Sequence, residues 1–419
     1  AAGCVAEQAM LIGDHALVNA LLAAALRLVD TDEAGTRIEL HTRRHSALYS
    51  LGRLDEADEE YCAIEGLRTT ASDRAAATAV QVSSLTHRKR LAEAVALGIE
   101  TLRELGITVP EPERLDAELD HQIGYLYQWL DHIDAADPAR PDLSDPTLLA
   151  ATRLISAALP PAYFVPDFSL YAWLSLDALR IWLEHGPGRT LVGPATHAAN
   201  AAMALRGDYA LAYRAMRRIL ELGEARGYEP ETSLVRASFA TLCCWFEPIE
   251  NAVQEAKRAR EGLIAGGELA WAGYACQPAV VGLLDSAPSL DIYVAEVEAG
   301  LALVRRTGNE QTSQWLDGHR WLAGVLRGDS GAAAGEAMPI DRYADNPSAL
   351  LKAHVNHAIA AAVFGDTAGL ARHSAAAMPM LPAAVGQYTT AVAHLLRGLA
   401  LAEQARATDS DDRAALLAE

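Results

Sequence analysis

A Gly-Asp dipeptide that recurs between apolar helical stretches constrains the fold of this chain more than any other feature. It occurs in LRGDYALA at 205–212, in LRGDSGAA at 326–333 and in VFGDTAGL at 363–370. Glycine after a helix readily takes the left-handed conformation that ends it. The aspartate can then accept hydrogen bonds from the free N–H groups that open the next helix. The pattern therefore predicts helical hairpins joined by short turns.

A small residue follows these turns at a fixed distance. Alanine stands five positions after the turn glycine at Ala57, Ala212 and Ala333. A small side chain there lets two helix backbones approach closely. A looser copy at 87–105 keeps a leucine and an alanine but has no glycine at its turn.

The unit resembles the tetratricopeptide repeat, in which about 34 residues form two antiparallel helices. The resemblance predicts an all-α fold of hairpins stacked into a right-handed superhelix, or solenoid. We expect an N-terminal array over 1–137, an atypical helical bridging segment over 138–190 and a C-terminal array over 191–419, as one continuous solenoid.

Gly-Asp-Ser-Gly is also the tetrapeptide around the nucleophile of chymotrypsin-type serine proteases. Such a protease needs a β-barrel, an upstream His and Asp, and a further glycine where Ala332 stands. Because nearly the same stretch recurs at other turns, we interpret Ser330 as a turn residue. We expect no catalytic residue and no enzyme activity.

Composition supports a folded helical protein and excludes some partners. Hydrophobic residues make up 51% of the 419 residues, mainly alanine and leucine, which favour helices, whereas aromatic residues make up 6%. The net charge is −20, and the only lysines are Lys89, Lys257 and Lys352. Nucleic acid and anionic membranes are therefore poor partners. The five cysteines show no CxxC spacing, which predicts reduced thiols in a cytoplasmic protein.

Two longer segments resemble a particular family. One is DPTLLAATRLISAALPPAYFVPDFSLYAWLSLDALRIWLEHG at 145–186, and the other is WFEPIENAVQEAKRAREGLIAGGELAWAGYACQPAVVGLL at 245–284, continued by 291–309. Together they resemble the helical-repeat region of large bacterial signalling regulators. In that family, a Ser/Thr-kinase-like domain and a signal-transducing NTPase module precede the repeats, and GAF, histidine-kinase or phosphatase domains often follow. The resemblance covers roughly residues 35–400.

The resemblance implies the non-catalytic middle region of such a regulator, or a free-standing relative of it. The sequence contains no Gly-Lys dipeptide, so it has no Walker A loop, and it has no His-Arg-Asp or Asp-Phe-Gly motif. We expect a sensor or scaffold that binds a protein segment or a small effector. It would relay that event to NTPase or output domains, on the same polypeptide or on a separate protein.

The candidate contact residues form the richest aromatic cluster of the chain. Helix packing is one interpretation of this cluster and a recognition pocket is the other. Its members are Tyr163, Phe164, Phe168, Tyr171 and Trp173.

We expect no cofactor and no metal ion. His41 and His45 stand one helical turn apart, as metal ligands often do, but no carboxylate or cysteine accompanies them at ligand spacing. We therefore expect His41 and His45 to pack between helices instead of binding a metal ion. We expect the same packing role for His354 and His357.

Two other functions stay open. An all-α enzyme of the toroid type would need two carboxylates that face each other across a cavity for acid and base catalysis. A stand-alone dimerisation scaffold would need no small-molecule site at all.

Overall fold

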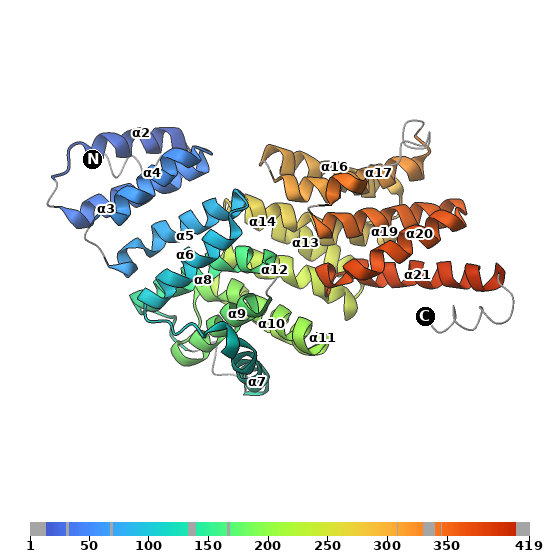
Figure 1. The fold of residues 1–419 in the computed structure, drawn as a ribbon, viewed down its shortest axis with the longest axis horizontal. Helices are drawn as coiled ribbons and strands as arrows, with labels where there is room; N and C mark the ends of the chain where they lie inside the picture. The colour runs from blue at the N-terminus through green and yellow to red at the C-terminus, as the bar shows by residue number, and fades with distance from the viewer. Residues whose placement is uncertain are drawn as a thin grey trace. The chain divides into compact units, whose positions relative to one another are not determined.

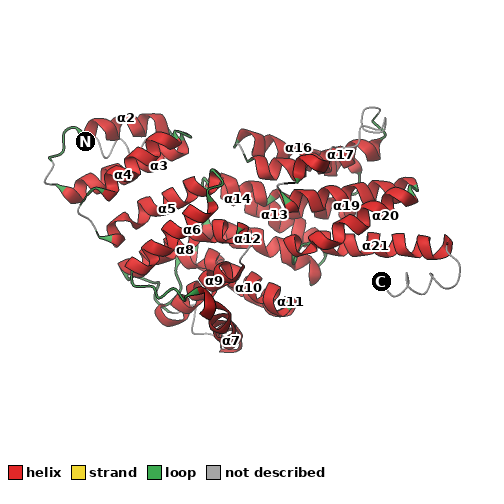
Figure 2. Ribbon diagram, viewed as in Figure 1, coloured by secondary structure: helices red, strands yellow, loops and turns green. Residues whose placement is uncertain are grey.

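The computed structural model describes residues 14–30, 33–67, 70–132, 140–165, 168–307, 309–329, 340–344 and 346–407. Throughout these ranges the regular structure is helical and no strand occurs (Figure 2). The predicted all-α class is therefore confirmed. No helix in the described ranges is long and apolar enough to cross a membrane.

The chain divides into two compact units, Ala1–Ala202 and Met203–Glu419. The predicted limit at residue 137 lies outside the described residues, and the limit at 190 falls in the first turn of α10. The three-part division stays a prediction.

Unit 1 is built from helices that pack mainly on their neighbours in the chain (Figure 1). α2 packs on α3, α3 on α4 and α5 on α6, while α8 packs on both α5 and α6, and α7 packs on α9. The helices are α2 (His15–Leu26), α3 (Ala34–Ser50), α4 (Leu54–Glu65), α5 (Ala71–His87), α6 (Leu91–Glu104), α7 (Leu115–His132), α8 (Pro146–Phe164), α9 (Phe168–His185) and α10 (Arg189–Arg206), which continues into unit 2.

Unit 2 follows the same principle, with one addition. Successive helices pack on each other, and the last helix, α21, also packs on α19 (Figure 1). It packs on α15 as well, which lies far earlier in the chain. The main helices are α11 (Tyr209–Arg226), α12 (Glu231–Leu242), α13 (Ile249–Ala265), α14 (Leu269–Tyr274), α15 (Cys276–Ser286), α16 (Leu290–Arg306), α17 (Glu310–Arg327), α19 (Pro347–Phe364), α20 (Thr367–Ala377) and α21 (Tyr388–Ala407).

The Gly-Asp turns have the predicted geometry where the structure describes them. Gly207 has φ 65°, and the Asp208 carboxylate accepts a 2.8 Å hydrogen bond from the backbone N–H of Leu211. Gly365 has φ 72°, and Asp366 accepts a 2.9 Å bond from the N–H of Gly369. Both aspartates cap the helix that follows.

The turn that contains Ser330 is described only in part. Gly328 is left-handed, with φ 75°, whereas Ser330 and Ala333 lie outside the described residues. The matching alanines Ala57 and Ala212 are both fully buried, as a close approach of two helices requires.

The looser copy at 87–105 reaches the same turn without glycine. Lys89 has φ 59° and occupies the left-handed position between α5 and α6. A residue with a Cβ atom is strained there. The hairpin geometry is therefore kept even where the sequence does not favour it.

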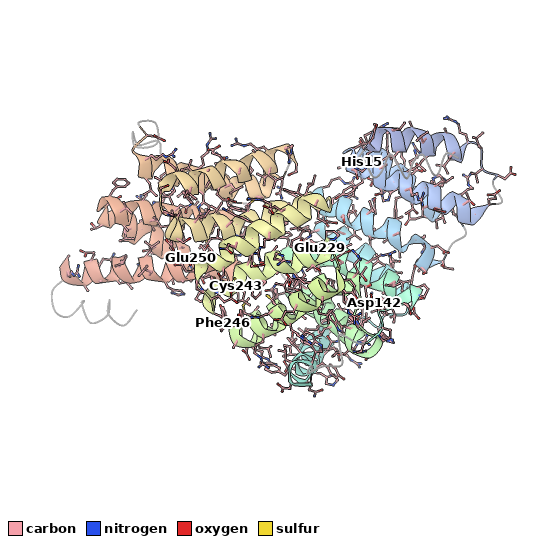
Figure 3. All side chains as sticks on the ribbon, turned by 180° about the vertical axis from the view of Figure 1, so that it is seen from behind. His15, Asp142, Glu229, Cys243, Phe246 and Glu250 are labelled. Atoms are coloured by element: carbon pink, nitrogen blue, oxygen red, sulfur yellow. The ribbon has the colours of Figure 1, made fainter. Side chains whose placement is uncertain are left out.

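Both units have cores built from aliphatic and aromatic side chains. In unit 2, Tyr293, Val297, Leu301 and Leu316 are almost completely buried where α16 packs on α17. The end of α12 lies nearer the surface: Cys243 is buried there, whereas Phe246 is half exposed and stacks on Tyr213 (Figure 3).

Candidate ligand-binding site

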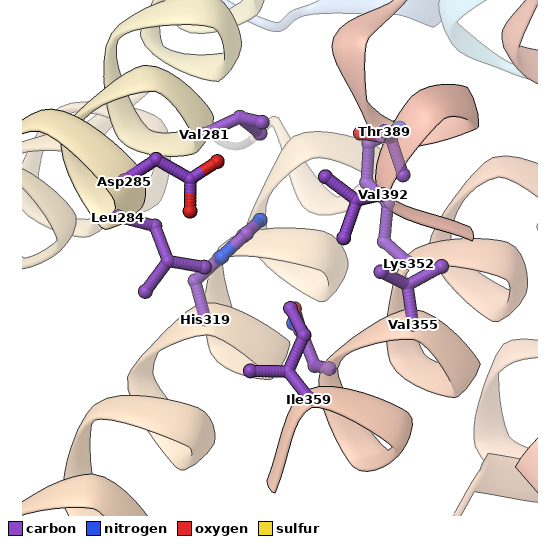
Figure 4. A pocket seen from close by; sticks show the side chains of 10 residues that line it. Val281, Leu284, Asp285, His319, Lys352, Val355, Ile359, Thr389 and Val392 are labelled. Carbon is purple, nitrogen blue, oxygen red and sulfur yellow. The ribbon is translucent and has the colours of Figure 1, made fainter. Parts of the chain in front are cut away.

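A hollow lies in unit 2 between α15, α17, α19 and α21 (Figure 4). Its enclosed space is small, about 20 Å³, and the rest of the hollow is open to solvent. Mostly apolar walls with a few placed polar groups are typical of small-molecule sites. The apolar lining residues are Val281, Leu284, Val355, Ile359 and Val392, and the polar ones are Asp285, His319, Lys352, Asn356 and Thr389.

α19 contributes the largest part of the lining because its spacing places four residues on one face. Lys352, Val355, Asn356 and Ile359 stand at positions i, i+3, i+4 and i+7 of the helix. α17 packs on α19 and supplies His319. α21 packs on both α19 and α15 and so brings its first turn to this face. The hollow results from this packing.

Four of the polar lining residues are buried. His319, Lys352, Asn356 and Thr389 each expose at most 4% of their surface. His319 Nε2, Asn356 Nδ2 and Thr389 Oγ1 make no hydrogen bond within the described part of the chain. Burying a polar group without a partner costs free energy, so a water molecule or a polar ligand group in the hollow would hydrogen-bond to these three atoms.

Lys352 brings a positive charge into the wall of the hollow. Its Nζ donates a 2.7 Å hydrogen bond to Ser348 Oγ and lies 5.8 Å from the centre of the Trp315 ring. No carboxylate lies within ion-pair distance of it among the described residues. Burial lowers the pKa of Lys352 to about 8, because removal from water disfavours the charged form.

His319 is held by Tyr293. The Tyr293 hydroxyl lies 2.9 Å from His319 Nδ1 and 3.2 Å from the His319 carbonyl oxygen. Burial, with the nearby Lys352 charge, lowers the pKa of His319 to about 3. The ring is therefore neutral at physiological pH, and its orientation is fixed from the side away from the hollow.

Asp285 stands at the exposed side of the hollow. Burial, together with this carboxylate, raises the pKa of Tyr388 to about 12. Asp285 is the one carboxylate among the described lining residues. The hollow therefore does not contain the facing pair of carboxylates that a toroid-type enzyme would need.

The segment before α21 positions Thr389. Trp245 Nε1 donates a 2.7 Å hydrogen bond to the Gly386 carbonyl oxygen, and Gln277 Nε2 donates a 2.6 Å bond to Gln387 Oε1. Gly386 has φ 80°, and a Cβ atom there would lie 2.4 Å from Met203 Cε. Glycine is favoured at this position because the left-handed conformation strains a residue with a Cβ atom, and the end of the Met203 side chain would also have to move.

The predicted aromatic cluster lies in unit 1, and four of its five members come together. The Tyr163 ring centre lies 5.4 Å from that of Phe164 and 5.3 Å from that of Tyr171, and the Phe168 centre lies 5.0 Å from that of Tyr171. Tyr163 and Phe164 are 46% and 40% exposed. Trp173 is buried elsewhere on α9, and no ring contact joins it to the others within the described residues.

Tyr171 anchors this cluster to α10. Its hydroxyl lies 3.0 Å from His197 Nδ1, and burial lowers the pKa of His197 to about 4. Tyr163 and Phe164 therefore form a small exposed aromatic surface that rests on a buried tyrosine. Its role in contacting a ligand or partner stays a prediction.

The paired histidines have protein partners. His41 Nδ1 lies 2.5 Å from Glu60 Oε1, and His45 Nε2 lies 3.0 Å from Gln81 Oε1. His354 Nδ1 lies 3.1 Å from Nδ1 of His373. Within the described residues, no group of three or more histidine, cysteine, aspartate or glutamate side chains is arranged to hold a metal ion.

The described cysteines are free thiols. Burial raises the pKa of Cys243 to about 12 and that of Cys244 to about 11. Both are therefore protonated and weakly nucleophilic at neutral pH. Cys4 lies outside the described residues.

Sequence reasoning missed the hollow. Lys352 was visible as one of three lysines and as the only charged residue of PSALLKAHVNHAIAAAVF, the sequence of α19. A charge within an apolar helix, with Asn356 one turn later, was a usable signal. His319 and Thr389 carry no local signal, because only the packing of α17 and α21 brings them to this site.

No model of a known protein family matches the chain, and no curated protein sequence is significantly similar to it.

Proposed function

We propose that the chain is a non-catalytic recognition module that binds a small effector in the hollow of unit 2. The observation that carries this proposal is the set of buried polar atoms without hydrogen-bond partners on His319, Asn356 and Thr389. A ligand group that hydrogen-bonds to them would recover the free energy that their burial costs.

The proposed architecture is a superhelix of tetratricopeptide-like hairpins. Its support is the recurring turn, with left-handed Gly207, Gly328 and Gly365, and the serial packing of neighbouring helices within each unit. Such an array offers concave surfaces for recognition. In the proposed role, binding at α15, α17, α19 and α21 stabilises one arrangement of these helices, and attached or associated NTPase or output domains respond to it.

The signalling part rests on the resemblance of 145–186 and 245–309 to the repeat region of bacterial signalling regulators. The reading frame that encodes the chain tests this part. A P-loop NTPase encoded upstream and an output domain encoded downstream would support the relay. A frame that encodes neither would remove the intramolecular relay and would leave a separate protein as the partner.

The binding part is tested with 1-octanol, a neutral probe with an apolar tail. We expect 1-octanol to raise the melting temperature of the chain and to slow amide hydrogen exchange in α19 and the first turn of α21. Val392→Phe fills the hollow and should abolish both effects. Val363→Phe, at the 60% exposed end of α19, is the matched control and should leave them intact. Equal effects in both variants would contradict binding in the hollow.

A further inference from the structure

We infer that the hollow selects a small monocarboxylate with an apolar body, and that Lys352, Asn356 and Thr389 hold its carboxylate group. This inference rests on the proposed function and specifies its ligand class. It follows from the charge, the hydrogen-bond capacity and the shape of the hollow.

The buried charge of the site is the ammonium group of Lys352. The only side-chain hydrogen-bond partner of Lys352 among the described residues is the neutral Ser348 hydroxyl. An isolated buried charge is costly unless an opposite charge accompanies it. A monoanion balances one ammonium group, whereas a phosphate dianion would leave a net negative charge buried.

The free hydrogen-bonding groups are mainly donors. Asn356 Nδ2 carries two N–H groups, and the Thr389 hydroxyl carries one O–H group. Several donors around one cation match a carboxylate, which only accepts hydrogen bonds.

The rest of the hollow requires an apolar body. Val281, Leu284, Val355, Ile359 and Val392 line it, and burial of methylene groups against them contributes about 0.8 kcal/mol per group. The enclosed space has room for the carboxylate group, and the aliphatic tail would lie along the apolar walls toward the open side. Asp285, at the exposed side, disfavours a second anionic group there.

Octanoate, 1-octanol and octylamine provide a direct test, because they share a tail and differ in the head group. Calorimetric titration of the full chain near pH 7 should give octanoate the highest affinity, at least about tenfold above 1-octanol, and octylamine the lowest. Equal or higher affinity for 1-octanol would overturn the carboxylate inference but leave the small-molecule function standing. Binding of none of the three would count against both.

Lys352→Met keeps the length of the side chain and removes its charge. We expect it to lower the affinity for octanoate about tenfold or more and to leave that for 1-octanol within about twofold. Lys89→Met, at an exposed turn of unit 1, is the matched control and should change neither. An unchanged affinity for octanoate in Lys352→Met would overturn the inference, once circular dichroism shows that the variant is folded.

The pH dependence of the unsubstituted protein supplies a test that needs no variant. Lys352 loses its proton between about pH 7 and about pH 9. The affinity for octanoate should therefore fall across this range, whereas the affinity for 1-octanol should stay constant. Among the described residues, the other titratable groups that line the hollow are His319 on α17 and Asp285 on α15, and Tyr388 and His373 lie on α21 and α20, which pack on α19. A constant affinity for octanoate across this range would overturn the assignment to Lys352.

Three of these groups keep the same protonation state between about pH 7 and about pH 9. Burial lowers the pKa of His319 to about 3 and that of His373 to about 4, and the pKa of Tyr388 is raised to about 12. The Asp285→Asn variant tests the contribution of the fourth group, the Asp285 carboxylate. Because it removes a negative charge from the exposed side, we expect it to strengthen octanoate binding about two- to threefold and to preserve the pH dependence.

Discussion

Lys352 Nζ donates a 2.7 Å hydrogen bond to Ser348 Oγ, one turn earlier on α19, and so the buried ammonium group has a neutral partner instead of a carboxylate. This arrangement costs stability in the free protein. A site that lowers the stability of the fold and carries unused hydrogen-bonding capacity is expected where a ligand binds.

Lys352→Met should therefore stabilise the free protein near pH 7 by about 2 kcal/mol, as measured by urea denaturation. The unfolded chain binds more protons than the folded one between about pH 8 and about pH 10, because the pKa of Lys352 is lower in the folded state. The free energy of unfolding of the unsubstituted protein should rise with pH across this window, and the rise should be smaller in the variant. A destabilised variant with the same pH profile would show that Lys352 pairs with a carboxylate.

Thr389→Val should leave the free energy of unfolding unchanged or raise it by up to about 1 kcal/mol, because a buried hydroxyl without a partner is replaced by a methyl group. The same substitution should weaken octanoate binding. Thr152→Val is the matched control. The Thr152 hydroxyl is 2.7 Å from that of Thr190, and its loss should cost about 1 kcal/mol. Equal losses of stability at both positions would show that Thr389 already has a partner in the free protein.

Acid should destabilise unit 2 through His319. Its pKa is about 3 in the folded state and near 6.5 in the unfolded chain. The unfolded chain therefore binds more protons between these values, and stability is lost as the pH falls from about 6.5 toward about 3. His319→Gln should flatten this loss in denaturation series from about pH 7 to about pH 5. An identical slope in the variant would indicate that His319 is protonated in the folded protein.

Lys89→Gly should stabilise unit 1 by about 0.5–1 kcal/mol, because glycine takes the left-handed conformation at φ 59° without strain. Gly207→Ala introduces the opposite change at the equivalent turn and should cost about 1 kcal/mol. Thermal melting of both variants checks the pair. A destabilising Lys89→Gly would mean that the lysine side chain contributes more than the turn geometry.

Gly386→Ala should destabilise unit 2 and also weaken ligand binding. The added methyl group meets Met203 Cε at 2.4 Å and Sδ at 2.9 Å, at a left-handed position. The flexible end of Met203 can move away, but strain at the left-handed position remains, and we expect it to shift the first turn of α21 and with it Thr389. We expect a loss of about 1–3 kcal/mol, measured by urea denaturation, with weaker octanoate binding. Lower stability with full octanoate affinity would show that Thr389 does not depend on this turn.

Local structure could be predicted from the sequence, whereas the hollow could not. The turns at Gly207 and Gly365 follow from conformational preferences of neighbouring residues, so they could be predicted. The aromatic cluster was also found, but its helix geometry separates Trp173 from Tyr171. The hollow could not be predicted, because it depends on α21 packing on α15, a contact between segments far apart in the chain.

The most direct test of the central claim is a crystal structure of the protein with octanoate. We expect the tail between α15, α19 and α21, with the carboxylate within hydrogen-bond distance of Asn356 Nδ2 and Thr389 Oγ1 and beside Lys352. Octanoate bound with its carboxylate toward Asp285, bound outside unit 2, or absent at a concentration that saturates binding in solution would contradict it.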